Sequence, residues 1–242
     1  MFHNTSRPSQ YNPIILCYHI RTHIDKTLVF DVFLFYNKSI NDSIFKQKGA
    51  RQMYTWDELE RSIVNCGRCM LCKKRIQAVP GKGNHSSQIM LVAEAPGKQE
   101  DLQGIPFVGP AGKVLDILLT SAGLNRKDVY ITNIVKCHPP GNRDPLPEEQ
   151  ETCMQYLRAE TTLLHPPIIV CLGRIAAQKL ISPNFKISRE HGMWTHRKGY
   201  WMTAVYHPSA ILRDPAKLEE AKQDFQSIIS KVREIEESKY PL

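Results

Sequence analysis

The segment Ile89-Met90-Leu91-Val92-Ala93-Glu94-Ala95-Pro96-Gly97 decides the fold. Its first five residues are apolar and lack the polar alternation of a half-exposed strand, and Pro96 and Gly97 end the run. A short apolar run of this kind is typical of a strand buried on both faces of a parallel sheet. We therefore expect a strand over 89–93, followed by a loop that carries the carboxylate of Glu94.

Similar apolar runs recur along the chain and alternate with helical patterns. Further strands are expected at Val129–Val135, Ile168–Leu172 and Trp201–Tyr206. The apolar residues of Ala111–Ala122 share one helical face, and later helices begin at Pro147 and at Asp214-Pro215. This alternation predicts an α/β protein whose parallel sheet is wrapped by helices.

Composition limits the function classes. The 242 residues, 42% of them hydrophobic, suffice for one sizeable core with short appendages. The formal net charge of +8 suits a phosphate-rich partner but does not identify one. No run approaches the ~18 apolar residues of a membrane span, and no signal peptide precedes the seven cysteines. We expect a soluble cytoplasmic protein whose clustered cysteines are metal ligands or buried thiols rather than disulfides.

The N-terminal region differs from the rest. Residues 1–52 mix aromatic, β-branched and polar residues without a period or a motif, whereas Thr55 precedes acidic residues as a helix cap does. We expect a leader over 1–52 and the functional domain over 53–242. The hypothesis that Met53 is the true translation start would be contradicted by peptides from residues before it in the mass spectrum of the native protein.

Four cysteines have the spacing of a metal site. Cys66 and Cys69 form a C-x-x-C pair, Cys137 ends the second predicted strand, and Cys153 lies in the following helix. Zinc and a [4Fe–4S] cluster both accept four thiolates, and the spacing does not separate them. Cys72 extends the pair to C-x-x-C-x-x-C, but the fourth Cys followed by Pro that a ferredoxin would have is absent.

Polar or aromatic residues lie near the ends of the predicted strands. Glu94 follows the first strand, Asn133 lies in the second, His207 follows the fourth, and Phe107 lies in the loop of residues 104–112. Open α/β sheets bind ligands at the carboxyl ends of their parallel strands. We therefore expect these four side chains to form one pocket, although each loop taken alone would suggest only a surface turn.

Four ordered motifs make the pattern specific. They are E-A-P-G-x-x-E from Glu94, G-x-P-F-V-G-x-A-G from Gly104, T-N-x-V-K-C-x-P-P-x-N-R from Thr132 and H-P-S from His207. Over residues 64–213 the chain resembles the family 4 uracil-DNA glycosylases, except that Ala93 replaces the usual first Gly. The resemblance implies a three-layer α/β/α sandwich around a central, mainly parallel four-stranded sheet. It also implies a hydrolase that excises a flipped-out uracil from DNA in base excision repair and leaves an abasic site.

The resemblance also implies a cofactor. Its pattern places a [4Fe–4S] cluster on four of the cysteines, with Cys72 outside the set. The implied ligands are Cys66, Cys69, Cys137 and Cys153. We expect this cluster to be structural, joining the first cysteine segment to the second strand and the following helix.

The base-binding roles follow position by position from the same resemblance. Phe107 would stack on the extruded uracil, and Asn133 would read its N3–H and O4 edge. Glu100 would lie near C5, where the methyl group of thymine must be refused. Ala95, Gly97 and Ser209 complete the implied substrate-binding set.

The resemblance implies His207 as a catalytic residue, and Glu94 and Asn142 are further candidates. His207 would donate to uracil O2 as negative charge builds on the leaving base. Glu94 is the candidate for stabilising the sugar cation, and Asn142 for positioning the attacking water. Better-known uracil-DNA glycosylases have an Asp for this task where the present chain has Ala95.

Two other functions fit parts of the sequence. One is a superfamily member that captures uracil sites covalently, but the inserted basic loop of that variant is missing after Pro139-Pro140. The other is a non-catalytic zinc module that binds nucleic acid. A zinc protein would be colourless, whereas an iron–sulfur protein is brown. The predicted partner is uracil-containing DNA, with no membrane, and the predicted state is a monomer.

Overall fold

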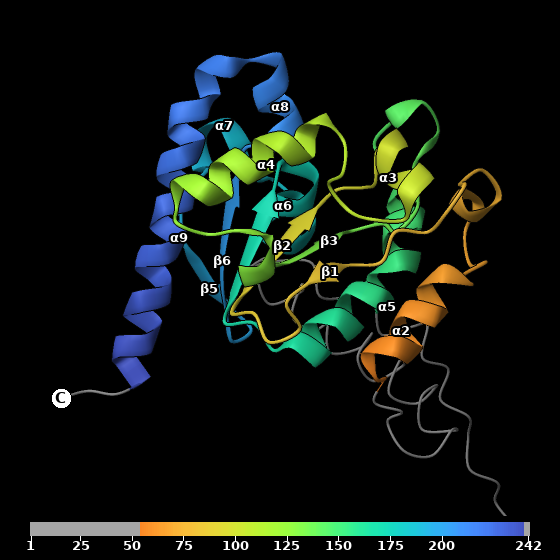
Figure 1. Ribbon diagram of the computed structural model, residues 1–242, viewed down its shortest axis with the longest axis horizontal. Coiled ribbons are helices and arrows are strands. Elements are labelled where there is room, and N and C mark those ends of the chain that lie inside the picture. Colours follow the sequence, from red (N-terminus) through yellow and green to blue (C-terminus); the bar gives the residue numbers. More distant parts are fainter. Residues whose placement is uncertain (1–53, 240–242) are drawn as a thin grey trace, which may run out of the picture. The chain divides into compact units, whose positions relative to one another are not determined.

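The computed structural model describes residues 54–239, which form a twisted six-stranded sheet covered by helices (Figure 1). The strand order is β1-β3-β2-β4-β6-β5. The strands are β1 (Lys82–Gly83), β2 (Ile89–Ala93), β3 (Tyr130–Asn133), β4 (Ile168–Leu172), β5 (Thr195–Arg197) and β6 (Tyr200–Val205). The α-helices are α2 (Trp56–Val64), α3 (Lys98–Gln103), α4 (Pro110–Ser121), α5 (Pro147–Leu164), α6 (Arg174–Leu180), α7 (Ile187–Glu190), α8 (Pro208–Arg213) and α9 (Leu218–Lys239).

The four central strands are parallel, as the sequence predicts. In the middle of the sheet Leu91 of β2 lies opposite Ile131 of β3 on one side and Val170 of β4 on the other. The mainly parallel four-stranded sheet is thus confirmed. Two short antiparallel strands at the edges, β1 beside β3 and β5 beside β6, extend it to six. Two or three half-exposed residues are too few to produce a periodic pattern, so the sequence does not reveal these strands.

The sheet separates two hydrophobic cores, which makes the fold a three-layer sandwich. Met90 and Val92 of β2 point to the core formed with α2, α5 and α6. Ile89 and Leu91 point to the opposite core, which α4, α8 and α9 complete. Because neighbouring residues of a strand face opposite sides, both faces of β2 must be apolar. This requirement explains the unbroken apolar run that marks the strand in the sequence.

Local signals in the sequence set the ends of several helices. Thr55 caps α2 through a reciprocal capping box with Glu58, as its position before acidic residues predicts. Pro110 and Pro147 occupy the first turns of α4 and α5, where the missing proline N–H costs no hydrogen bond. The predicted starts of these three helices are therefore correct to within one residue.

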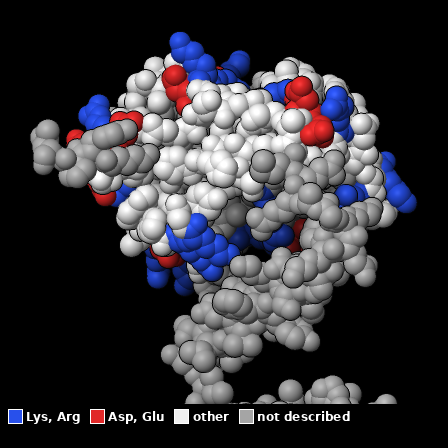
Figure 2. Space-filling model, turned by 90° about the horizontal axis from the view of Figure 1, so that it is seen from below, with Lys and Arg blue, Asp and Glu red and all other residues white. Residues whose placement is uncertain are grey.

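One face of the molecule carries scattered charged side chains (Figure 2). On the face in Figure 2, Lys and Arg (blue) form separate groups with Asp and Glu (red) among them, rather than one continuous basic area. None of the helices within 54–239 has both the length and the hydrophobicity needed to cross a bilayer. The expected leader over 1–52 and the hypothesis about Met53 lie outside the described residues.

Candidate active site

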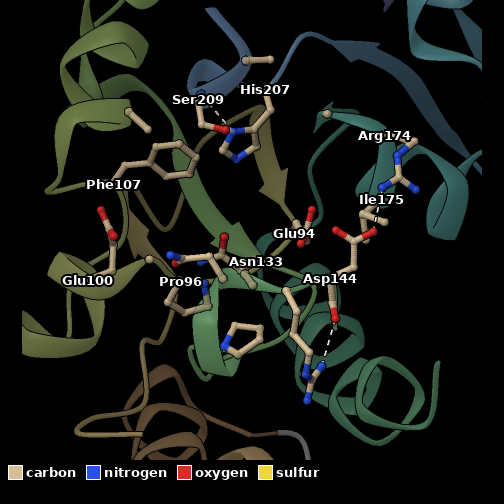
Figure 3. Close-up of a pocket in the computed structure, with 18 of the residues that line it drawn as sticks. Glu94, Pro96, Glu100, Phe107, Asn133, Asp144, Arg174, Ile175, His207 and Ser209 are labelled. Atoms are coloured by element: carbon tan, nitrogen blue, oxygen red, sulfur yellow. Dashed lines mark hydrogen bonds and ion pairs between the residues drawn. The ribbon is translucent and has the colours of Figure 1, made fainter. Parts of the chain in front are cut away.

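A cavity of about 600 Å³ opens where the parallel strands end. This volume lies in the roughly 300–1,000 Å³ range of small-molecule sites. All nine residues predicted to bind or convert the substrate line it: Glu94, Ala95, Gly97, Glu100, Phe107, Asn133, Asn142, His207 and Ser209. They come from the ends of β2, β3 and β6 and from the loops and short helices that follow (Figure 3). The structure thus brings the predicted set into one place, while the role of each residue stays a prediction.

One wall of the cavity can accommodate a planar ring. The Phe107 side chain lies there, with its ring centroid 5.8 Å from that of His207. Asn133 is buried at the end of β3, and within residues 54–239 its side-chain amide has no hydrogen-bond partner. Glu100, from α3, is also buried and accepts a hydrogen bond from the N–H of Gly109 at 2.8 Å. A free amide beside an aromatic face suits a flat molecule with polar edges.

The His207 imidazole is held in one tautomer. It caps α8, and its Nδ1 accepts the backbone N–H of Ser209 at 3.1 Å and lies 2.8 Å from the Ser209 hydroxyl. Because Nδ1 is an acceptor in this arrangement, the proton of the neutral ring is on Nε2. Burial, with a smaller contribution from Arg213, lowers the pKa of His207 to about 4. At neutral pH the cavity therefore contains an uncharged imidazole with an N–H to donate.

Gly173 leaves room for this histidine. It follows β4 in a left-handed conformation with φ of 91°, and a Cβ there would lie 2.8 Å from the Cβ of His207. Any larger residue would be strained and would displace the imidazole. The ends of β4 and β6 are thus fitted closely to each other beneath the cavity.

Charged groups line the opposite side of the cavity. Glu94 and Asp144 lie there together, and Arg174 donates to Asp144 Oδ2 at 2.7 Å (Figure 3). Burial and, less strongly, the charge of Asp144 raise the pKa of Glu94 to about 7, and the charge of Arg174 opposes this rise. The carboxyl of Glu94 is therefore poised to change its charge near neutral pH.

The loop after β3 is braced by its own side chains. Asn142 is exposed at the cavity mouth, and its Oδ1 lies 2.9 Å from Nε2 of His138. Both terminal nitrogens of the Arg143 guanidinium, Nη1 and Nη2, donate to the buried Glu149 carboxylate, at 2.9 and 2.7 Å. Arg143 thus anchors the loop to α5, and the Asn142 oxygen already has a partner.

A second, small cavity contains the cysteine motif. Five thiols line it, namely Cys66, Cys69, Cys72, Cys137 and Cys153. Two Sγ atoms accept hydrogen bonds: Cys137 from Arg75 Nη1 at 3.0 Å, and Cys153 from the Lys136 N–H at 3.3 Å. Donors aimed at sulfur are characteristic of metal-bound thiolates, whose charge they stabilise. Cys171 lies away from this cavity, buried in β4.

The thiols surround the cavity without forming a compact mononuclear site. No three His, Cys, Asp or Glu side chains in the described range could together hold a metal ion.

Comparison with known proteins assigns the family. Residues 80–233 match the family described as the Uracil DNA glycosylase superfamily. The chain is 46% identical over 185 residues to the Type-4 uracil-DNA glycosylase of Archaeoglobus fulgidus, a match that covers 73% of this chain and 92% of that protein. The chain belongs to the type-4 uracil-DNA glycosylases. The Thermotoga maritima Type-4 enzyme is 40% identical (67% and 88% covered), and a Type-5 enzyme of Thermus thermophilus is 34% identical (54% and 68% covered).

Membership of the type-4 uracil-DNA glycosylases bears on the cysteines, because this is the iron–sulfur class of the superfamily. The residues present fit such a group: several thiols face one cavity, and two of them receive N–H hydrogen bonds. Burial raises the pKa of the thiols of Cys69, Cys137 and Cys153, so cation binding there would have to release their protons.

Two residues of this type-4 site escape sequence reasoning. Asp144 and Arg174 lie 30 positions apart and meet only because the loop before α5 folds over the start of α6. Arg174 directly follows Gly173 at the end of β4. The rule that parallel strands present their functional groups at their carboxyl ends would have identified it.

Proposed function

We propose that this chain hydrolyses the N-glycosidic bond of a flipped-out deoxyuridine in DNA, releases uracil and leaves an abasic site. The observation that carries the proposal is the meeting of a free amide, an aromatic face and a neutral imidazole donor in one cavity at the strand ends. Membership of the type-4 uracil-DNA glycosylases supports it. Such an activity belongs to base excision repair.

Asn133 and Phe107 recognise the base. An amide offers a donor and an acceptor together, as the O4 and N3–H edge of uracil requires. Cytosine presents the opposite pattern, and each buried polar group left unpaired costs ~1–3 kcal/mol. Phe107 stacks on the base, and Glu100, fixed by the N–H of Gly109, lines the C5 side where thymine carries its methyl group.

His207 assists the departure of the base. Glycosidic cleavage gives an oxocarbenium-like sugar and an anionic uracil, so a donor aimed at O2 acts mainly in the transition state. The Nε2–H of a neutral imidazole makes this donation without a charge on the ring. By analogy with other oxyanion donors, removing it raises the barrier by about 2.7–4 kcal/mol.

Glu94 acts on the sugar. As a carboxylate it stabilises the positive sugar and accepts a proton from the attacking water. Asp144 raises the pKa of its carboxyl and Arg174 lowers it. Asn142, whose oxygen is engaged by His138, offers the water its N–H₂ group at the cavity mouth.

We infer further that Cys66, Cys69, Cys137 and Cys153 hold a [4Fe–4S] cluster. When bound, the cluster supplies a covalent link between the segment after α2, the end of β3 and α5. The type-4 family, which is the iron–sulfur class of the superfamily, favours the cluster over a single zinc ion. Cys72 faces the same cavity as a fifth thiol and stays outside the proposed ligand set.

The test uses labelled DNA with one uracil, treated with alkali after incubation to cut abasic sites. Wild type should cleave uracil DNA and leave otherwise identical cytosine and thymine DNA intact. Asn133→Ala and His207→Ala should lose activity by roughly 10²-fold or more, whereas His196→Ala, which removes an exposed imidazole on β5, should not. A denaturing gel with a protein–DNA adduct would favour covalent capture, and a colourless protein would favour zinc.

A further inference from the structure

The backbone at Phe107 is strained. Its φ is 54°, in the left-handed region that a bulky side chain rarely adopts. Such conformations persist only where surrounding contacts enforce them, and they cluster at functional sites. The conformation places the phenyl ring on the cavity wall, 5.8 Å from the His207 ring between centroids. What holds the backbone at Phe107 therefore determines where the ring lies.

Arg126 holds the backbone at Phe107 from outside the cavity. This residue begins the short 3₁₀ turn η3 (Arg126–Asp128) and is absent from the cavity lining. Its Nη2 donates to the carbonyl oxygen of Phe107 at 2.6 Å and to that of Gly112 at 3.2 Å, and its Nη1 donates to that of Pro106 at 3.3 Å. One planar guanidinium thus binds both ends of the Phe107 turn, a geometry that lysine cannot reproduce.

Gly112 makes this close approach possible. A Cβ on Gly112 would lie 1.9 Å from the Phe107 carbonyl oxygen and 2.9 Å from Nη2 of Arg126. The first turn of α4 therefore packs directly on the carbonyl that Arg126 binds. On the other side of the turn, Glu100 binds the N–H of Gly109. Two side chains thus hold the loop, Glu100 at the Gly109 N–H and Arg126 at the carbonyls of Pro106, Phe107 and Gly112.

The ion pair of Arg126 does not account for this arrangement. Nε of Arg126 lies 2.6 Å from Oδ1 of Asp116, but the two side chains are 37% and 51% exposed. Exposed ion pairs contribute little to folding stability. The contacts to the three carbonyls are partly buried. Asp116 thus provides a matched control, because among the described residues its carboxylate hydrogen-bonds to Arg126 and to no group of the loop.

We propose that Arg126 is a positioning residue that holds Phe107 in its left-handed conformation and thereby sets the stacking surface for the extruded base. The proposal rests on the proposed function, since the ring must have a base to stack on. Stacking is made when the base enters the cavity and is kept in the transition state. Its loss therefore raises KM more than it lowers kcat.

The test is a double-mutant cycle on uracil-containing DNA. Phe107→Ala should lower kcat/KM by roughly tenfold or more, the usual effect of removing a base-stacking ring. Arg126→Ala should lower it by a comparable factor, mainly through KM, while Asp116→Asn stays within about twofold of wild type. In the Phe107→Ala background, Arg126→Ala should have little further effect, because a residue acting through the ring has nothing left to position. Arg126→Lys should restore only part of the loss.

Each of the following outcomes supports or overturns either the role proposed for Arg126 or the proposed function. If wild type excises uracil and Arg126→Ala behaves like Asp116→Asn, the inference is overturned while the proposed function stands. If the effects of Arg126→Ala and Phe107→Ala multiply, Arg126 acts by another route and the inference also fails. Melting temperatures of Arg126→Ala and Asp116→Asn show whether misfolding causes the loss. If Arg126→Ala does not fold, Arg126→Lys in both backgrounds completes the same cycle. Wild type without excision would overturn the proposed function.

Discussion

Activity should depend on pH through Glu94. Burial, followed by Asp144, raises the pKa of its carboxyl to about 7, so below that pH the group is mostly protonated and cannot stabilise the sugar cation or accept a proton from water. About one tenth of the molecules carry the charge at pH 6 and about nine tenths at pH 8. We therefore expect kcat/KM to rise about tenfold between pH 6 and pH 8, and this rising limb of the pH profile should be missing in Glu94→Gln.

Two neighbours should move this limb in opposite directions. Asp144→Asn removes a charge that raises the pKa of Glu94, so the limb should shift to lower pH without disappearing, because burial remains the larger cause. Arg174→Gln removes a charge that lowers the pKa, so the limb should shift to higher pH. The His207 imidazole, with its pKa lowered to about 4, should add no limb above pH 5.

The assay is initial-rate excision from uracil-containing DNA at constant ionic strength, since salt alone changes DNA affinity. A flat profile between pH 6 and 8 in wild type, or an unchanged limb in Glu94→Gln, would show that Glu94 is not the titrating group. Folding stability should change in the opposite sense. A carboxyl with a raised folded-state pKa binds its proton more tightly than in the unfolded chain, so its contribution falls as pH rises from 4.5 towards 7.

Three other changes give separate checks. Glu160→Gln leaves the buried ammonium of Lys136, 2.7 Å away, without its counter-charge, and should lower the unfolding free energy in urea by about 3–5 kcal/mol. Cys153→Ser should abolish the visible absorption of the purified protein, whereas Cys171→Ala, which removes a buried thiol elsewhere, should retain it; equal spectra would contradict the ligand assignment. Thr55→Ala removes the cap of α2 and should cost about 0.5–2 kcal/mol in the same urea titration, with excision unchanged.

The sequence predicts the parts of the fold that have strong periodicity. The unbroken apolar runs of β2 and β4 match the observed strands residue for residue, because a strand buried on both faces leaves no place for polar residues. The edge strands β1 and β5 have no such constraint and were missed. Their positions are set by pairing with a neighbour, a property that periodicity along one segment does not contain.

The site shows the same division. Side chains directly at strand ends, such as Asn133 and His207, could be placed because the sheet topology carries them to one edge. The pairing of Asp144 with Arg174 and the contacts of Arg126 with the Phe107 turn depend on how loops fold over one another. No spacing rule relates such residues, so only the three-dimensional structure reveals them.

The end of β3 is sensitive to changes in length. Asn133 faces the large cavity, Cys137 faces the thiols, and between them the Lys136 ammonium binds the Asn133 carbonyl at 2.9 Å. Inserting or deleting one residue here would shift either the amide or the sulfur out of its place. By contrast, Gly199 lies in the exposed turn between β5 and β6, where even an added Cβ would meet nothing within 4 Å. Extra residues should be accepted in that turn and rejected between 133 and 137.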